Sequence, residues 1–108
     1  MVVSGRVSVI IPTYQRAHVV GRAINSALAQ TYPDIEILII DDGSTDNTAQ
    51  VVQGYGSNVH YIYQGNQGRP AARNNGIRHA TGEFIAILDS DDWWQPSKLE
   101  KQVACMQE

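Results

Sequence analysis

Four short apolar runs, rich in β-branched residues, alternate along the chain with segments of helical spacing, and this alternation limits the fold more than any other feature. The runs span residues 7–11, 35–40, 59–63 and 84–88, and the helical segments span residues 19–30, 45–53, 71–79 and 96–108. Runs with few polar residues are typical of strands that are covered on both faces. The alternation therefore predicts an α/β fold of three layers, α/β/α, with a mostly parallel sheet and right-handed crossovers.

Length and composition describe one small globular domain. The chain has 108 residues, of which 43% are hydrophobic and 18% are charged. Its net charge of -3 argues against a nucleic-acid partner, because general nucleic-acid binders carry a basic face. No apolar run approaches the roughly 20 residues of a membrane span, and the first residues lack a signal-peptide pattern, so we expect a cytoplasmic protein. Cys105 is the sole cysteine, which excludes an intramolecular disulfide.

Three carboxylates lie within four residues directly after the last apolar run, at Asp89, Asp91 and Asp92. Like charges this close repel one another, and a hard divalent cation bound through oxygen relieves the repulsion. Residues i and i+2 of an extended chain point the same way, so Asp89 and Asp91 converge on one point. The pattern predicts a metal site that attracts phosphate. The alternative is a solvated turn whose aspartates cap a helix.

Polar residues follow three of the predicted strands, at residues 12–14, 41–42 and 89–92. In parallel sheets, ligands bind beyond the carboxyl ends of the strands, so these groups should meet at one edge. The first strand is not followed by a glycine-rich dinucleotide turn, and no P-loop occurs. A calcium loop begun at Asp89 fails at Trp93 and Trp94. A metal-bridged phosphate site beside an aromatic platform remains.

Three further residues are candidates for this site, each with an alternative role. Tyr14 is placed to stack on a nucleobase, or to pack on the sheet edge. Asp42 is placed to accept a hydrogen bond from a base N–H, or to cap the next helix, a role for which Asp46 competes. Arg73 is placed to contact diphosphate oxygens, or to lie exposed on its helix.

Four motifs in one order resemble glycosyltransferase family 2, the inverting nucleotide-sugar transferases of the GT-A fold, whose sheet is Rossmann-like. The resemblance covers nearly the whole chain and rests on residues 7–16, 41–46 and 66–77, and on the DxD-like sequence 89–92 followed by Trp94 and Pro96. Gln15 departs from the family pattern, in which asparagine is frequent. Each motif alone is weak, and the four together are specific.

The resemblance implies a role for each candidate. It assigns nucleotide binding to Pro12, Tyr14, Asp41, Asp42, Arg73 and Asp89. It assigns the coordination of Mn²⁺ or Mg²⁺ to Asp91, with Asp89 facing the metal or the ribose. The implied function is transfer of a sugar from a nucleotide-diphosphate sugar, UDP-sugars being favoured, to a sugar, lipid or polysaccharide acceptor with inversion. Polysaccharide or cell-wall biosynthesis is the implied setting, with peripheral attachment at the cytoplasmic face of a membrane as a second location.

Catalytic domains of the family are longer than this chain, so residues 1–108 resemble their N-terminal, nucleotide-binding half, ending after the DxD motif. We expect the general base beyond residue 108, because Glu100 has the spacing of a helix cap with Ser97 and Glu108 is the last residue. The isolated chain is therefore expected to be inactive in sugar transfer and to self-associate through surface that the second half covers.

Two other functions stay open at this point. The first is a module that binds a nucleotide without catalysis, which the missing base favours. The second is a metal-dependent nucleotidyltransferase or phosphohydrolase on a similar sheet. Tyr14 and Asp42 after the first two strands fit the transferase better than this last function.

Overall fold

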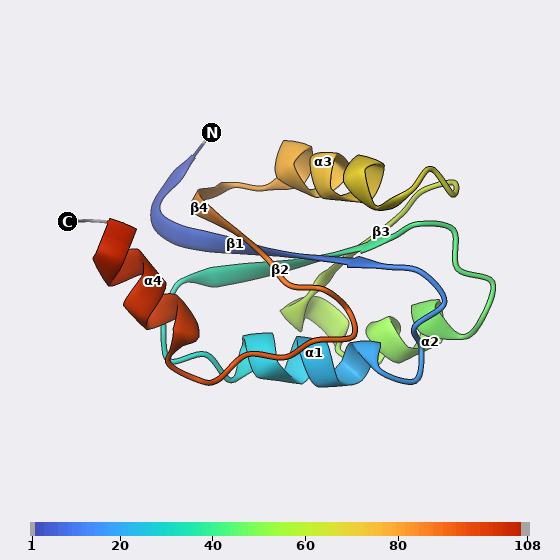
Figure 1. The fold of residues 1–108 in the computed structure, drawn as a ribbon, viewed down its shortest axis with the longest axis horizontal. Coiled ribbons are helices and arrows are strands. Elements are labelled where there is room, and N and C mark those ends of the chain that lie inside the picture. Colours follow the sequence, from blue (N-terminus) through green and yellow to red (C-terminus); the bar gives the residue numbers. More distant parts are fainter. Residues whose placement is uncertain (1, 107–108) are drawn as a thin grey trace.

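The computed structural model describes residues 2–106, which fold as a four-stranded, wholly parallel sheet with helices on both faces (Figure 1). The elements are β1 (Val3–Thr13), α1 (Val20–Leu28), β2 (Ile35–Asp41), α2 (Thr48–Gln53), a short 3₁₀ turn (Gly56–Asn58), β3 (His60–Tyr63), α3 (Arg69–His79), β4 (Gly82–Ile87) and α4 (Lys98–Met106). The strand order is β3-β2-β1-β4. The expected three-layer α/β fold is confirmed.

β1 is the central strand and pairs with β2 on one side and β4 on the other. Its side chains alternate between the two faces, so Val9 lies on the face of α1 while Ile10 packs beneath α3. β1 ends at Thr13, which is in register with Asp41 at the end of β2. This shared register brings the residues that follow the two strands to one edge of the sheet.

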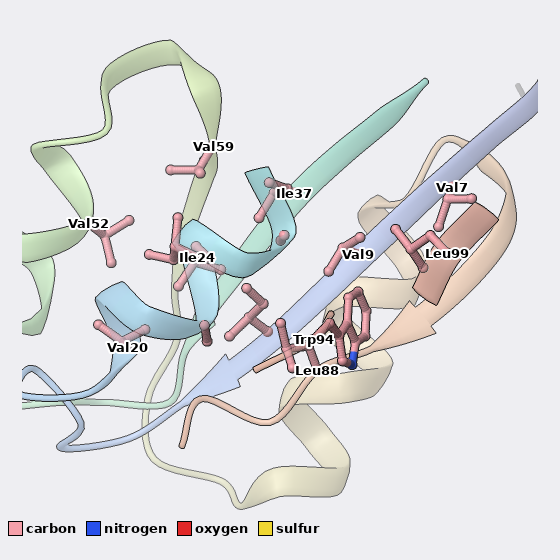
Figure 2. Packing of buried hydrophobic residues seen from close by; sticks show 14 of the residues in the cluster. Val7, Val9, Val20, Ile24, Ile37, Val52, Val59, Leu88, Trp94 and Leu99 are labelled. Carbon is pink, nitrogen blue, oxygen red and sulfur yellow. The ribbon is translucent and has the colours of Figure 1, made fainter. Parts of the chain in front are cut away.

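The larger core lies between the sheet and the layer formed by α1, α2 and α4 (Figures 1 and 2). α1 contributes Val20, Ala23, Ile24 and Ala27, all fully buried and spaced as one face of a helix. Figure 2 shows Trp94 and Leu88 beside Val9 in this cluster. Trp94 therefore serves the core, which ties the segment after β4 to the centre of the sheet.

Among the described elements, α3 is the one helix that covers the opposite face of the sheet, and it packs against the sheet through small residues (Figure 1). Ala72 and Gly76 are buried beneath the helix. A Cβ on Gly76 would lie 2.6 Å from Ile10 Cγ2, so glycine permits the close approach of helix and sheet. α3 begins at Arg69, with Pro70 in its first turn, rather than at residue 71 as the sequence indicated.

The start of α4 differs from the expected cap. The spacing of Ser97 and Glu100 predicted a capping box, but Glu100 Oε2 instead accepts a hydrogen bond from Thr31 Oγ1 at 2.5 Å. The buried side chain of Gln30 takes the capping role, because its Oε1 accepts a hydrogen bond from the backbone N–H of Leu99 at 3.0 Å. The sequence could not show this cap, since its partners are 69 residues apart. Within residues 2–106, no helix combines the length and the apolar character that crossing a bilayer requires.

Candidate functional site

A cavity of about 250 Å³ opens at the carboxyl ends of the strands. Its lining comes from all four β-to-α connections and comprises Pro12, Thr13, Tyr14, Arg16, Asp42, Asn66, Gly68, Arg69, Ala72 and Ser90. The connection from β1 runs through α1 on one face, whereas the connection into β4 runs through α3 on the other (Figure 1). The cavity thus lies where ligands bind in open parallel sheets, at the point where the chain switches faces.

Tyr14 lines the cavity with 46% of its surface exposed. The next residue, Gln15, has φ of 54°, a left-handed conformation that costs a residue with a side chain about 1 kcal/mol. Gln15 is held there because its N–H donates to Ser44 Oγ at 2.8 Å and its Oε1 accepts from the N–H groups of Thr45 and Asp46. These hydrogen bonds join the loops that follow β1 and β2, so the backbone beside Tyr14 is held in place.

Asp42 lines the cavity, although only 5% of its surface is exposed. Its Oδ1 accepts hydrogen bonds from Gln64 Nε2 and from the N–H of Gln67, both at 2.8 Å, and its Oδ2 accepts one from the N–H of Gly68 at 2.9 Å. Burial alone would raise the pKa of Asp42, but the hydrogen bonds from Gln67, Gln64 and Gly68 outweigh it and hold the pKa below its ordinary value. Asp42 is thus an ionised acceptor at neutral pH.

Two aspartates of the second motif, Asp41, which was expected at the site, and Asp46, which was expected to cap a helix, serve the fold in this structure. Asp41 is fully buried and does not line the cavity; its Oδ1 accepts from the N–H of Ser44 and its Oδ2 from the hydroxyl of Tyr61. Burial and this bond to Asp41 raise the pKa of Tyr61. Asp46 accepts from the N–H and hydroxyl of Thr48 and so anchors the start of α2, the role that competed with Asp42.

Arg73 lies one turn into α3 and faces the segment that follows β4. Its Nη2 is 4.0 Å from Asp89 Oδ1, and the two side chains are 41% and 40% exposed. The Nε atom of Arg73 is buried and has no hydrogen-bond partner among the described residues. An exposed ion pair of this length contributes little to stability, so both groups are free to exchange partners with a ligand.

Asp91 lies in the turn after β4, and its carbonyl oxygen accepts a hydrogen bond from Arg22 Nη2 of α1 at 3.1 Å. Its neighbour Asp92 is differently engaged, because Asp92 Oδ1 accepts from the N–H of Trp93. Within residues 2–106, no group of three or more His, Cys, Asp or Glu side chains is arranged to hold a metal. Two carboxylates, Asp89 and Asp91, suit a Mg²⁺-type ion only if ligand oxygens complete the coordination.

Several lining residues were given no individual role by the sequence. Asn66 and Gly68 lie in the third motif, and the Nδ2 of Asn66 donates to the carbonyl of Asp42 at 3.1 Å. Ser90 lies within the acidic turn, between Asp89 and Asp91, and a single serine carries no sequence signal of its own there. Arg16 and Arg69 add positive charge to the lining, and only their positions in the loop that follows β1 and at the start of α3 could have indicated this.

The chain matches the family model "Glycosyl transferase family 2" over residues 8–108. An uncharacterized glycosyltransferase of Nostoc sp. is 48% identical over 106 residues, which cover 94% of this chain and 33% of that protein. The Escherichia coli UDP-Glc:alpha-D-GlcNAc-diphosphoundecaprenol beta-1,3-glucosyltransferase WfgD is 41% identical over 102 residues, covering 93% of this chain and 40% of that protein. The chain thus spans well under half of the length of these relatives.

Solved structures show the same fold. S. aureus TarS 1-349 in complex with UDP superposes with a TM-score of 0.87 at 33% identity, covering 94% of this chain and 32% of that one. The mannosyltransferase PcManGT from Pyrobaculum calidifontis, in complex with GDP-Man and Mn2+, superposes with a TM-score of 0.76 at 31% identity, covering 82% and 28%. The sheet and its helices match these GT-A glycosyltransferases, and the family model spans almost every residue. This chain belongs to glycosyltransferase family 2.

Proposed function

We propose that this chain forms the donor-binding part of a glycosyltransferase that takes a UDP-sugar and transfers the sugar to an acceptor hydroxyl with inversion. The observation that carries the proposal is the cavity at the strand ends, where an ionised acceptor, Asp42, and an exposed ring, Tyr14, share one lining. A carboxylate pairs with the imide N–H of uracil, while the ring offers a stacking surface. Pro12 closes the lining beside Tyr14.

Uridine is favoured over guanosine as the nucleoside. Guanine also presents an N–H to a carboxylate, and the Pyrobaculum enzyme is described with GDP-Man. The larger structural likeness is to TarS, which is described with UDP and with UDP-GlcNAc, and WfgD is named for UDP-Glc.

The diphosphate would lie near the arginines at this edge. Arg16 and Arg69 line the cavity, and the guanidinium of Arg73 is next to Asp89. Arginine forms charge-assisted hydrogen bonds with phosphate oxygens, so these side chains supply part of the neutralising charge. Asp91 would hold Mn²⁺ or Mg²⁺ with Asp89, and diphosphate oxygens would complete the shell. When bound, such an ion neutralises charge on the departing nucleoside diphosphate.

The acceptor site and the general base are assigned to the remainder of the family domain. Glu100 is bonded to Thr31, in the segment that leads into β2, and is not a residue of the cavity lining. Glu108 lies outside the described residues. We therefore expect residues 1–108 alone to bind a donor nucleotide without transferring sugar. For the full-length protein, a sugar, lipid or polysaccharide acceptor is proposed; WfgD is named for a lipid-linked one.

The test is a calorimetric titration of the protein with UDP, GDP, CDP and ADP in the presence of Mn²⁺. We expect UDP to bind most tightly and Tyr14→Ala to weaken it about tenfold, which is the effect of losing one base-stacking partner. Tyr63→Ala is the matched control, because Tyr63 is 58% exposed at the end of β3 and is not part of the cavity lining. Equal binding of the four nucleotides by a folded protein would refute the proposal.

A further inference from the structure

We propose that Gln64 and Asn75 are positioning residues that orient the Asp42 carboxylate and so determine how strongly the site prefers uracil to cytosine. The inference rests on the proposed function, since it concerns the same nucleotide cavity. It is carried by a continuous set of hydrogen bonds that runs from α3, through the end of β3, to Asp42. Neither Gln64 nor Asn75 lines the cavity, so each would act through Asp42.

The Asp42 carboxylate has little acceptor capacity left for a ligand. A carboxylate offers about four acceptor positions, and three protein donors occupy positions on Asp42. Two of these donors, Gln64 Nε2 and the N–H of Gln67, bind Oδ1, whereas within residues 2–106 Oδ2 accepts from the N–H of Gly68 alone. Oδ1 is therefore committed to the protein, and one acceptor position remains on Oδ2 for a ligand.

The side-chain amide of Gln64 is held in one direction. Its Oε1 accepts a hydrogen bond from Asn75 Nδ2 at 2.8 Å, so its NH₂ group is the end that faces Asp42 Oδ1. The backbone N–H of Gln64 donates to the carbonyl of Asp41 at 2.9 Å, which extends the pairing of β2 and β3 to this residue. Asn75 as a donor and Asp42 as an acceptor thus favour the same orientation of the amide, and the strand pairing fixes the backbone from which the Gln64 side chain extends.

Uracil and cytosine differ in what they present to a carboxylate. Uracil presents a donor at N3, whereas cytosine presents an acceptor there with an amino group beside it. A carboxylate held in one orientation repels the cytosine acceptor, because two acceptors then face each other without a proton between them. A carboxylate free to turn can reach the amino group of cytosine instead. The relay from Asn75 and Gln64 to Asp42 should therefore raise discrimination between the two bases rather than affinity for both.

The experiment measures the dissociation constants of UDP and CDP for three single variants with Mn²⁺ present. We expect Gln64→Leu to weaken UDP about tenfold and CDP by less than about twofold, so that the preference falls at least about fivefold. Asn75→Asp places an acceptor opposite Gln64 Oε1, which favours the reversed amide and should lower the preference similarly. Gln67→Leu is the matched control: its exposed side chain is replaced in the same loop, while its backbone N–H still binds Asp42.

A double variant separates a relay from two independent effects. If Asn75 acts through Gln64, adding Asn75→Asp to Gln64→Leu lowers the preference no further, because the amide that it orients is gone. An unchanged UDP-to-CDP ratio in Gln64→Leu, or an equal fall in Gln67→Leu, would overturn the inference while leaving the proposed function intact. If the unaltered protein does not prefer UDP to CDP, the proposed function and the relay both fall. Thermal melts of each variant identify losses caused by unfolding.

Discussion

Glu36, a single partly buried carboxylate in the sheet, is stabilised in its ionised form by hydrogen bonds. It lies in β2 among isoleucines, and its Oε2 accepts hydrogen bonds from Ser8 Oγ and from the N–H and hydroxyl of Thr81. Burial alone would raise the pKa of Glu36, but these hydrogen bonds, with Arg6 nearby, hold it below its ordinary value of 4.5. The ionised form is thus favoured by folding.

This lowered pKa makes part of the stability depend on pH. The contribution of Glu36 is fully present above pH 4.5 and is lost as the pH falls through the lower value of the folded state. We expect Glu36→Gln to lower the free energy of unfolding by about 1 kcal/mol at pH 7 and by progressively less below pH 4.5. Urea unfolding across this pH range measures the difference. Glu83→Gln, at an exposed carboxylate that accepts from the N–H of Gly5, is the control, and a pH-independent difference for Glu36→Gln would contradict the account.

For Asp42, the sequence predicted the position of the carboxylate but not its hydrogen-bond donors. Its place after β2 predicted a carboxylate at the ligand edge, and the structure places it in the cavity lining. Its three donors come from residues 64–68, more than 20 positions along the chain, and no local pattern indicates such partners. Asp41 shows the reverse case, since an adjacent aspartate of the same motif turns toward Tyr61 instead.

At the element scale, periodicity predicted α1 better than α3. α1 presents large buried residues such as Val20 and Ile24 at helical spacing, which gives a clear apolar face. α3 buries only Ala72 and Gly76, so its sequence carries little apolar periodicity although it covers a whole face of the sheet. The close contact with Ile10 depends on the absence of a side chain at Gly76. A pattern of apolar side chains cannot indicate a contact that is made by a residue without one.

We expect copies of the isolated chain to associate with one another through β4. It is an edge strand of the sheet, and Ile85 and Ile87 are 40% and 37% exposed on it. Free strand edges with apolar side chains pair readily with another chain, so a second copy should add along β4. We expect sedimentation velocity to show concentration-dependent dimers that Ile85→Lys abolishes and Leu28→Lys, at an equally exposed site on α1, preserves. A monomer at every concentration would contradict this expectation.

At the scale of the whole molecule, the order of elements and the ligand edge were both predictable. Alternating strands and helices leave few arrangements of a parallel sheet, and in these the residues after each strand meet at one edge. The four motifs therefore lie at the same edge of the sheet, and the cavity there takes its lining from all four connections. The caps, clamps and relays that hold this lining join distant residues and required the structure.

We expect the cavity to bind a nucleoside diphosphate together with a divalent metal held by Asp91. The most direct test is a calorimetric titration with UDP, first with Mn²⁺ and then with EDTA, of the unaltered protein, Asp91→Asn and Asp92→Asn. We expect UDP binding that EDTA removes, that Asp91→Asn loses and that Asp92→Asn retains, because Asp92 is engaged with the N–H of Trp93. UDP binding of equal strength in EDTA, or no UDP binding by the folded protein, would contradict this expectation.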